Sequence, residues 1–426
     1  MKAGRVTVTA FFLWLGLTLF IFACGLLPGA QTGGEEDGGE PIGLRVVYSS
    51  GDIRWIGSME WVAEEFMKKY PQIQVTLTAP ADVPGQSFTD RLKVLIAQDE
   101  FYDVVELREA VQFSDAGYLA PLPGSLTDLI DGVDEHELCY AIPRYTTTQG
   151  IVYNRELFDR LGLSIPQNYE DFLAVCDSIR RNGVNPVAVG GTDIWHMGFW
   201  GNYLYQNYLL DENNESRWER ERVVTMLADF RSLNRRGYID DRFFSISDSQ
   251  TIQELASGNA AMLYSGPWIM DQVTALNPQM DLGFFYLPGR DGRVRAMVDD
   301  SVTWGISAQC KEDEKRFEAA AEFLKFFYSE GIYEHILTRM NGNSVTVRPV
   351  RDQETMAQKT VQQAGERDVI FCSRFVGDEE TPDGFRSFYA QCLQEGLWGD
   401  TGLEEIAEEL ENRWKKQADG QEGRKK

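Results

Sequence analysis

The stretch that decides the fold is LRVVYSSGDIRWIGSMEWVAEEFMKKYPQIQVTL, residues 44–77. It begins with an apolar run at residues 44–48, which the polar segment SSGD follows, and this pattern predicts a strand that ends in a loop. Residues 59–70 carry apolar side chains at helical spacing and stop before Pro71. Residues 73–77 then read as a second strand, so the stretch predicts a strand–helix–strand unit.

The next segments extend this pattern. Residues 88–97 predict a helix and residues 102–107 a third strand, which together indicate an α/β domain with a largely parallel sheet. Ligands of such sheets bind at the carboxyl ends of the strands. The candidate ligand-binding residues that follow the first and third strands are Ser50, Asp52, Trp55, Glu106 and Arg108. A solvated loop is the alternative for Asp52, and an ion pair at the rim is the alternative for Glu106 with Arg108.

Strands and helices continue to alternate in the rest of the chain. The expected strands are 151–154, 186–190, 260–264 and 280–286. The expected helices are 169–181, 217–234, 251–256, 317–328 and 403–416. Between them, we expect the aromatic-rich stretch around Trp195 and Trp200 to lie in a Gly-rich loop.

Composition argues against several classes of function. The net charge is −25, from 66 acidic and 41 basic residues, which argues against a nucleic-acid partner because a basic face supplies most of that attraction. The three histidines lack zinc-site spacing, and no phosphate-binding loop, dinucleotide fingerprint or nucleophile elbow is present. We therefore expect no metal, no cofactor and no catalytic residue.

The first residues of the chain have the pattern of an export signal. A short basic segment precedes an uncharged, largely apolar run at residues 6–22, which predicts a secretory signal peptide, residues 1–23. Its end, IFAC at residues 21–24, resembles the lipobox of bacterial lipoproteins, and that resemblance implies a lipid on Cys24. An ordinary secreted protein is the alternative. Residues 24–43, rich in Gly and Glu, predict a flexible linker.

The cysteines do not predict disulfides. No CxxC pair occurs, and spacing does not reveal connectivity. Burial as small apolar side chains and disulfide pairing both remain open for the residues after the linker, which are Cys139, Cys176, Cys310, Cys372 and Cys392.

Several motifs, in one order along the chain, resemble the extracellular solute-binding proteins of bacterial ABC importers, in particular the sugar-binding branch that includes maltose-binding protein. The motifs are EFMKKYPQIQV at 65–75, YDVV at 102–105, YAIP at 140–143, IVYNRELF at 151–158, GNAAM at 258–262, GPW at 266–268 and WGIS at 304–307, followed by the helix 319–328.

The resemblance implies a periplasmic-binding-protein-like fold, with two α/β lobes joined by three crossing hinge segments and a ligand cleft between the lobes. We expect the crossings near residues 143–147, 260–265 and 302–305. The expected lobes are 44–142 with 264–301, and 144–262 with 305–426. The expected partners are a sugar and the membrane-embedded permease of an ABC importer, with the protein a monomer held by its lipid on the outer face of the cell membrane.

A sugar site needs aromatic platforms for the C–H faces and polar side chains for the hydroxyls. The chain contains 10 Trp. In addition to the residues at the strand ends, the candidates are Tyr145, Trp195, Trp200, Trp268, Asp300, Trp304 and Arg348. Core or hinge packing is the alternative for the aromatic residues, a turn for Asp300 and a surface position for Arg348.

Two other functions remain open. Acidic cleft residues would suit a polyamine, and aromatic clefts with carboxylates also occur in lipid-anchored glycosidases. Because catalytic acids have no fixed spacing, sequence alone does not separate a glycosidase from a sugar-binding protein.

Overall fold

The computed structural model describes residues 40–422, except 51, 82–87, 99, 131–139, 212, 214, 300–301, 349 and most of 351–383. The predicted signal peptide, Cys24 and Cys139 therefore lie outside the described residues. Within this part of the chain, no helix is long and apolar enough to cross a membrane.

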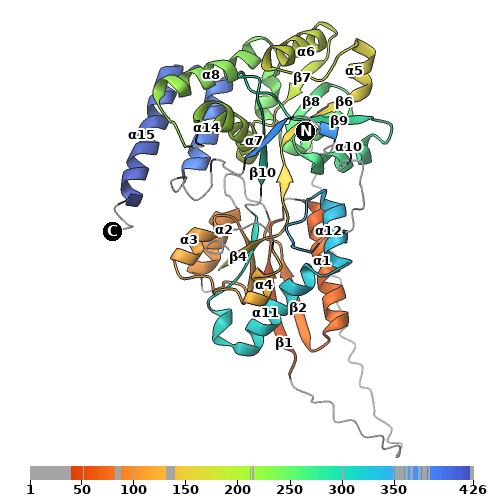
Figure 1. The fold of residues 1–426 in the computed structure, drawn as a ribbon, viewed down its shortest axis with the longest axis vertical. Coiled ribbons are helices and arrows are strands. Elements are labelled where there is room, and N and C mark those ends of the chain that lie inside the picture. The colour runs from red at the N-terminus through yellow and green to blue at the C-terminus, as the bar shows by residue number, and fades with distance from the viewer. Residues whose placement is uncertain are drawn as a thin grey trace, which may run out of the picture. The chain divides into compact units, whose positions relative to one another are not determined.

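The first lobe is built on a five-stranded sheet (Figure 1). In sheet order its strands are β2 (Ile73–Thr78), β1 (Ile42–Val47), β3 (Val104–Leu107), β11 (Thr303–Ile306) and β4 (Ala141–Pro143). β1 pairs in parallel with β2 and β3, as predicted, whereas β11 is antiparallel to both β3 and β4.

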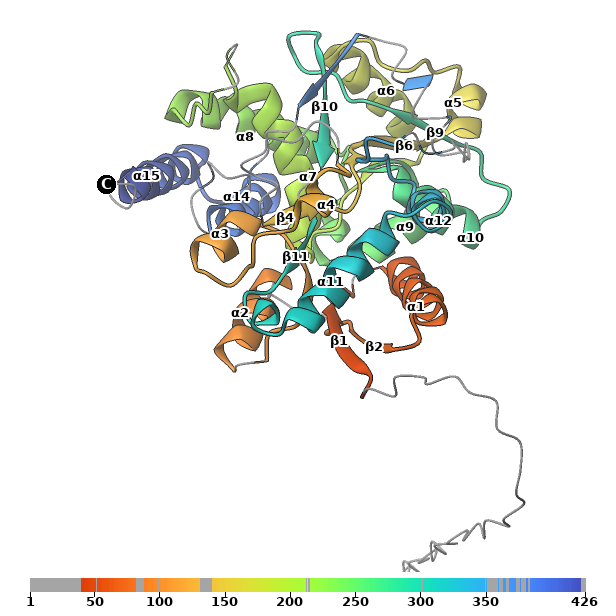
Figure 2. The same ribbon diagram turned by 60° about the horizontal axis from the view of Figure 1, so that its bottom comes forward.

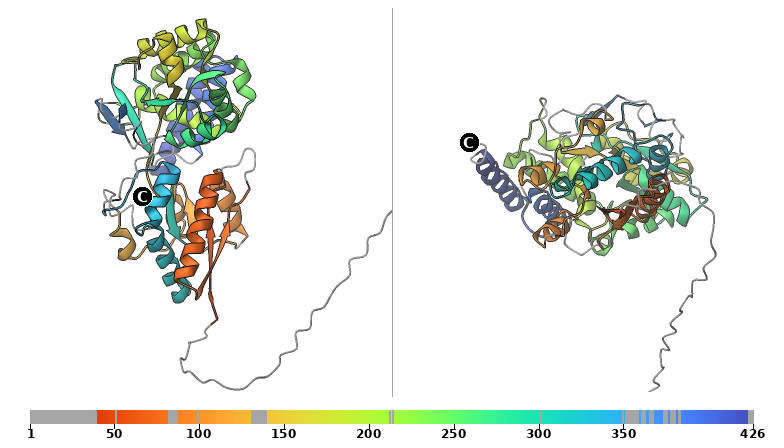
Figure 3. Two further views of the ribbon diagram at one scale, coloured as in Figure 1. Left: turned by 90° about the vertical axis from the view of Figure 1, so that its right-hand side faces the viewer. Right: turned by 90° about the horizontal axis from the view of Figure 1, so that it is seen from below.

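Helices cover both faces of this sheet. Alternate strand residues point to opposite faces, so Val46 and Val104 pack into one core while Val47 and Val105 pack into the other. The helices of the first core are α1 (Ile53–Lys69), α4 (Gly124–Thr127), α11 (Glu314–Phe327) and α12 (Ile332–Met340), and those of the second are α2 (Phe88–Ala97) and α3 (Ala110–Asp115). Figure 3 shows α1 side by side with α12.

The helix α1 begins earlier than predicted. Asp52 is its N-cap, and the Asp52 carboxylate accepts a hydrogen bond of 2.8 Å from the backbone N–H of Arg54. This contact satisfies one of the helix's unpaired N–H groups, so the polar loop after β1 leads directly into the helix.

The second lobe has a four-stranded sheet. In sheet order its strands are β7 (Asn185–Ala188), β8 (Ala260–Ser265), β6 (Gly150–Asn154) and β9 (Leu282–Phe285). Its helices are α5 (Arg155–Leu161), α6 (Tyr169–Arg181), α7 (Ile194–Leu204), α8 (Arg220–Arg235), α9 (Asp248–Ala256), α10 (Met270–Leu276), α14 (Phe385–Trp398) and α15 (Leu403–Glu422). Figure 2 shows α14 and α15 beside α8, where the three helices contact one another.

The structure corrects the prediction of a loop around Trp195 and Trp200, because both residues lie in α7. The glycine at 201 does not break this helix but lets it approach α14 closely. A Cβ at Gly201 would lie 2.9 Å from a ring atom of Tyr389, a distance that packed side chains do not tolerate.

A small third sheet connects the lobes. Its strands are β12 (Val369–Cys372), β10 (Val294–Asp299) and β5 (Thr147–Thr148). One crossing runs from β4 to β5, and a second runs from β10 to β11. The chain crosses again between α12 and β12, mostly outside the described residues.

The assignment of segments to lobes therefore differs from the prediction. β9 pairs with β6, so the segment 264–301 belongs with the second lobe, and β8 is a strand of that lobe rather than a crossing. β11 pairs with β3, and α11 packs in the same core, so residues 303–348 belong with the first lobe. Below, the first lobe means residues 42–143 with 303–348, and the second lobe means 147–299 with 369–422.

Candidate functional site

The strand directions place the polar segments of both lobes next to the crossings. β11 starts where the second crossing ends, and its Thr303 pairs with Leu107, the last residue of antiparallel β3. β1 is parallel to β3, so its carboxyl end lies at the same edge of the sheet. In the second lobe β6 starts at Gly150, which pairs with Ser265 at the end of β8. The ends of β1, β3 and β8 therefore lie on the crossing side of their sheets.

A buried carboxylate lies at this edge of the first lobe. Glu106 is only 2% exposed and accepts three hydrogen bonds. Its Oε1 accepts from the Ser49 hydroxyl at 2.5 Å. Its Oε2 accepts from Trp55 Nε1 at 2.7 Å and from Arg144 Nη1 at 3.0 Å. Each bond involves a charged group, which makes it stronger than a neutral one.

Aromatic rings enclose the cation that pairs with Glu106. The Arg144 guanidinium lies 4.4 Å from the ring centroid of Trp55 and 4.7 Å from that of Tyr145. Burial opposes its charge, but the electrostatic effects of four neighbours, Tyr145, Glu106, Asp299 and Asp52, together outweigh burial and raise the pKa of Arg144. Burial also raises the pKa of the Tyr145 hydroxyl. Arg144 thus keeps its charge, and the two rings cover its guanidinium.

Four predicted site residues meet in this cluster, although they come from distant segments. Trp304 of β11 lies 6.1 Å from Trp55 between ring centroids, and Tyr145 lies at the same centroid distance in an edge-on arrangement. Trp304 is fully buried in the core of the first lobe. Together with Glu106, these residues form a fixed base beneath the edge of the sheet. Arg144 was not among the predicted site residues, although its place directly after Pro143 in the expected crossing was a signal for it.

The matching edge of the second lobe carries an aromatic pair. Trp268 lies in a short helical turn, Pro267–Ile269, and is partly buried against Phe199 of α7, with ring centroids 5.6 Å apart. A Cβ at Gly266 would lie 1.9 Å from the Trp268 ring, so only glycine allows the ring to lie over the backbone there. Phe199 was not among the predicted site residues, because its glycine-rich surroundings indicated a loop and not a helix.

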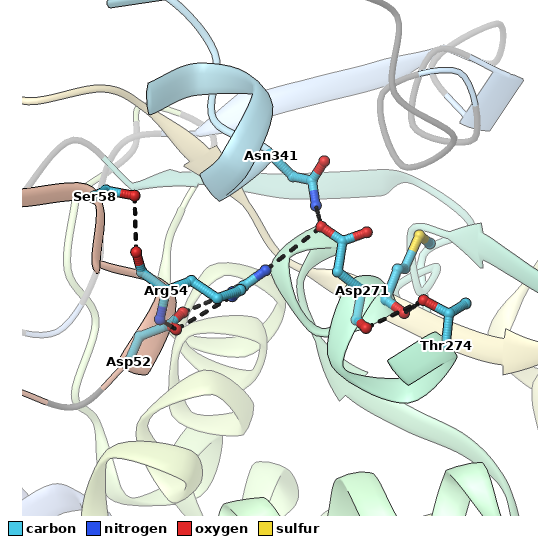
Figure 4. A network of polar contacts seen from close by, with 7 residues as sticks. Asp52, Arg54, Ser58, Asp271, Thr274 and Asn341 are labelled. Carbon is cyan, nitrogen blue, oxygen red and sulfur yellow. Dashed lines mark hydrogen bonds and ion pairs between the residues drawn. The ribbon is translucent and has the colours of Figure 1, made fainter. Parts of the chain in front are cut away.

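Contacts between charged groups connect the two edges. Arg54 Nη1 of α1 lies 3.6 Å from Asp271 Oδ2 of α10 (Figure 4). The same carboxylate oxygen accepts a hydrogen bond of 2.9 Å from Asn341 Nδ2, at the end of α12. Arg108 Nη1 lies 3.6 Å from Asp299 Oδ2. Carboxylates of the second lobe thus face cations of the first lobe at two places.

The remaining candidates lie in varied surroundings. The Ser50 hydroxyl donates a hydrogen bond of 2.5 Å to the Pro80 carbonyl, and Asp52 holds Arg54 by an ion pair of 2.6 Å. Trp200 is 1% exposed and packs in the core of the second lobe, as the core-packing alternative held. Arg348 is at the surface, 3.6 Å from the Glu330 carboxylate. Asp300 and the side chain of Trp195 lie outside the described residues.

Among the described residues, no group of three or more His, Cys, Asp or Glu side chains could hold a metal ion. Four cysteines are buried in that part of the chain and form no disulfide among the described residues, namely Cys176, Cys310, Cys372 and Cys392. Burial raises the pKa of Cys310 and of Cys392 to about 12, which keeps both thiols protonated at neutral pH.

The sequence matches one known protein family over more than half of the chain. A model of the family "Bacterial extracellular solute-binding protein" matches residues 57–334. The chain belongs to this family. Members of the family bind solutes outside the cell, and all the motifs that indicated the resemblance lie inside the matched range.

Individual solute-binding proteins resemble this one at low identity over long stretches. The Multiple sugar-binding protein of Streptococcus mutans is 20% identical over 365 residues, which cover 80% of this chain and 82% of the relative. The Melibiose/raffinose/stachyose-binding protein of Bacillus subtilis is 20% identical over 253 residues, 53% of this chain and 57% of the relative.

A solved structure of a chitin oligosaccharide binding protein superimposes with a TM-score of 0.78 at 19% identity, covering 89% of this chain and 100% of that one. At such identity the likeness supports the fold alone, and the fold is the expected one of two α/β lobes.

Proposed function

We propose that this solute-binding protein captures a sugar or oligosaccharide between its lobes and delivers it to the permease of an ABC importer. The observation that carries the proposal is the match over 80% of the chain to a relative named for binding multiple sugars. A second relative is named for melibiose, raffinose and stachyose. The aromatic pair at one edge and the polar groups at the facing edge suit such ligands.

Each lobe would make a different kind of contact with the sugar. Trp268 is the aromatic platform, and Phe199 supports its ring against the second lobe. Asp52 supplies hydrogen-bonding oxygens at the opposite edge, where its side chain is 26% exposed. Glu106 holds that edge rigid rather than binding the sugar, since its two oxygens already accept hydrogen bonds from Ser49, Trp55 and Arg144. Ser50, Arg108 and Trp195 remain candidates for contact with the sugar.

The protein acts outside the cell, tethered to the membrane by a lipid on Cys24. The IFAC segment at residues 21–24 supports this part of the proposal, because it follows an apolar signal-like run. The Gly-rich linker after Cys24 would let the lobes reach the permease. Mass spectrometry of the membrane-bound protein tests this directly, since a diacylglyceryl adduct on Cys24 is expected and an unmodified N-terminus elsewhere would contradict it.

The sugar proposal is tested by isothermal titration calorimetry against melibiose, raffinose, stachyose, maltose and a chitin oligosaccharide, with spermidine as the non-sugar control. We expect one-to-one binding of at least one sugar, with no product in the recovered ligand. A sugar present at 100 times its Kd should stabilise the protein by about 2.7 kcal/mol in a parallel thermal unfolding experiment. Binding of spermidine and of no sugar would indicate a polyamine-binding protein instead. Release of sugar fragments would show that the protein is an enzyme.

A further inference from the structure

We propose that Asp271 is a positioning residue that holds the two lobes together and thereby sets the affinity for sugar. We call these contacts the latch. It consists of Asp271 from the second lobe and of Arg54 and Asn341 from the first (Figure 4). The dependence of sugar affinity on the latch rests on the proposed function, whereas the effect of the latch on lobe closure does not.

The latch joins the edges at which the lobes face each other. Arg54 lies in the first turn of α1, directly after the carboxyl end of β1. Asp271 lies in the first turn of α10, shortly after the end of β8. Both strand ends lie on the crossing side of their sheets. A hinge rotation that separates these edges must therefore break the contacts of Asp271.

The first-lobe partners are held in place before they meet Asp271. Arg54 is fixed by the Asp52 carboxylate, which accepts from Nη2 at 2.6 Å and from Nε at 3.2 Å. Asn341 is 4% exposed and adopts a left-handed backbone conformation, φ 52°, that ends α12. Because these side chains are already ordered, forming the latch loses little conformational entropy.

The contact between Arg54 and Asp271 is incomplete in this arrangement of the lobes. Arg54 Nη1 is buried and makes no hydrogen bond with the described residues, and it lies 3.6 Å from Asp271 Oδ2. A further approach of about half an ångström would bring this pair within hydrogen-bond distance. Additional closure of the lobes would thus satisfy a buried donor, which favours the closed state over the present one.

The latch also shares a segment with the aromatic platform. Trp268 precedes Asp271 by one helical turn, in a short helix that runs into α10. A contact that fixes Asp271 therefore also fixes the position of the Trp268 ring relative to the first lobe. The latch can change affinity in this way even if the sugar never touches Asp271.

The lobe arrangement is tested first without any sugar. Small-angle X-ray scattering compares the wild type with the single variants Asp271→Asn, Asn341→Gly and Arg54→Gln. A double variant combines Asp271→Asn with Arg54→Gln. Asn341→Gly keeps the left-handed backbone at no steric cost and removes the side chain that contacts Asp271. The matched control is Asp281→Asn, which removes a similarly exposed carboxylate, 3.1 Å from Arg155, within the second lobe.

We expect a larger radius of gyration for Asp271→Asn than for the wild type, and a wild-type value for Asp281→Asn. The Arg54→Gln and Asp271→Asn changes should not be additive, because each removes the same contact. About 1 M salt should expand the wild type toward the variant. Equal radii for the wild type and Asp271→Asn would overturn the proposal, whatever the ligand.

The effect on affinity is tested by stopped-flow binding of raffinose, or of whichever sugar in the calorimetric panel binds the wild type. Asp271→Asn should weaken binding about threefold to fivefold, the range for a half-exposed ion pair. The change should lie mainly in a faster dissociation rate, with an unchanged thermal unfolding midpoint. If Asp271→Asn has a larger radius of gyration but an unchanged dissociation rate, the claim that the latch sets the sugar affinity is refuted. Failure of every sugar to bind would refute the proposed function and leave the scattering result to decide on the latch.

Discussion

Replacing the buried carboxylate of Glu106 by an amide, Glu106→Gln, should strongly destabilise the first lobe. The substitution keeps the shape and one carbonyl oxygen, which can still accept from Trp55 and Arg144. The Ser49 hydroxyl can turn to accept from the new amide. The charge is then the main loss, and the Arg144 guanidinium remains buried without its counterion, with its side chain only 14% exposed.

Removing one partner of a buried ion pair generally costs about 3–5 kcal/mol. Because the hydrogen bonds can be remade, we expect the lower end, about 3 kcal/mol. The measurement is urea unfolding followed by tryptophan fluorescence. The matched control is Glu330→Gln, which removes a carboxylate that is 63% exposed and lies 3.6 Å from Arg348 in the same lobe. The control should change the free energy of unfolding by less than about 0.5 kcal/mol. Equal, small shifts for both variants would refute the idea that the Glu106–Arg144 pair stabilises the lobe.

Three further outcomes follow from the site and the core. Trp268→Ala should weaken sugar binding at least about tenfold in calorimetry, whereas the fold should persist because the ring is only partly buried. Gly266→Ala should also weaken binding, since its Cβ would meet the Trp268 ring at 1.9 Å and displace it; wild-type affinity would show that the ring position is unimportant. Burial raises the pKa of the Cys310 thiol from 9.0 to about 12, so this group stabilises the fold fully below pH 9, and its contribution is lost as the pH rises toward 12. Cys310 should accordingly resist a thiol reagent at pH 8 in the native protein and react in urea, and rapid native labelling would contradict its burial.

Periodicity predicted the elements of the first lobe well because it is a local property. The strands near 44–48 and 73–77 and the helix between them are confirmed. Periodicity does not say which strand pairs with which, and this is why the segments around β9 and β11 were assigned to the wrong lobes. Pairing is decided by packing between residues far apart in the chain.

The same limit applies to the candidate site. The position of Glu106 at a strand end was a sound reason to expect it near the crossings, but its burial depends on Arg144 and Trp55, which no local pattern connects with it. The helix around Trp200 was missed because its glycines resemble loop residues. The close packing of Gly201 on Tyr389 becomes visible only in three dimensions.

The crossings are not independent strings of chain. Val298 and Asp299 of β10 pair with Thr148 and Thr147 of β5, so two crossings are joined in one antiparallel ribbon. The backbone of Thr146 also exchanges two hydrogen bonds with Asn343, which joins a third segment to them. A joint of this kind resists sliding and stretching, because either motion would break several backbone hydrogen bonds together, whereas a change of twist keeps them. The lobes are therefore expected to rotate about a single axis. Each residue of one lobe then follows one fixed arc relative to the other lobe.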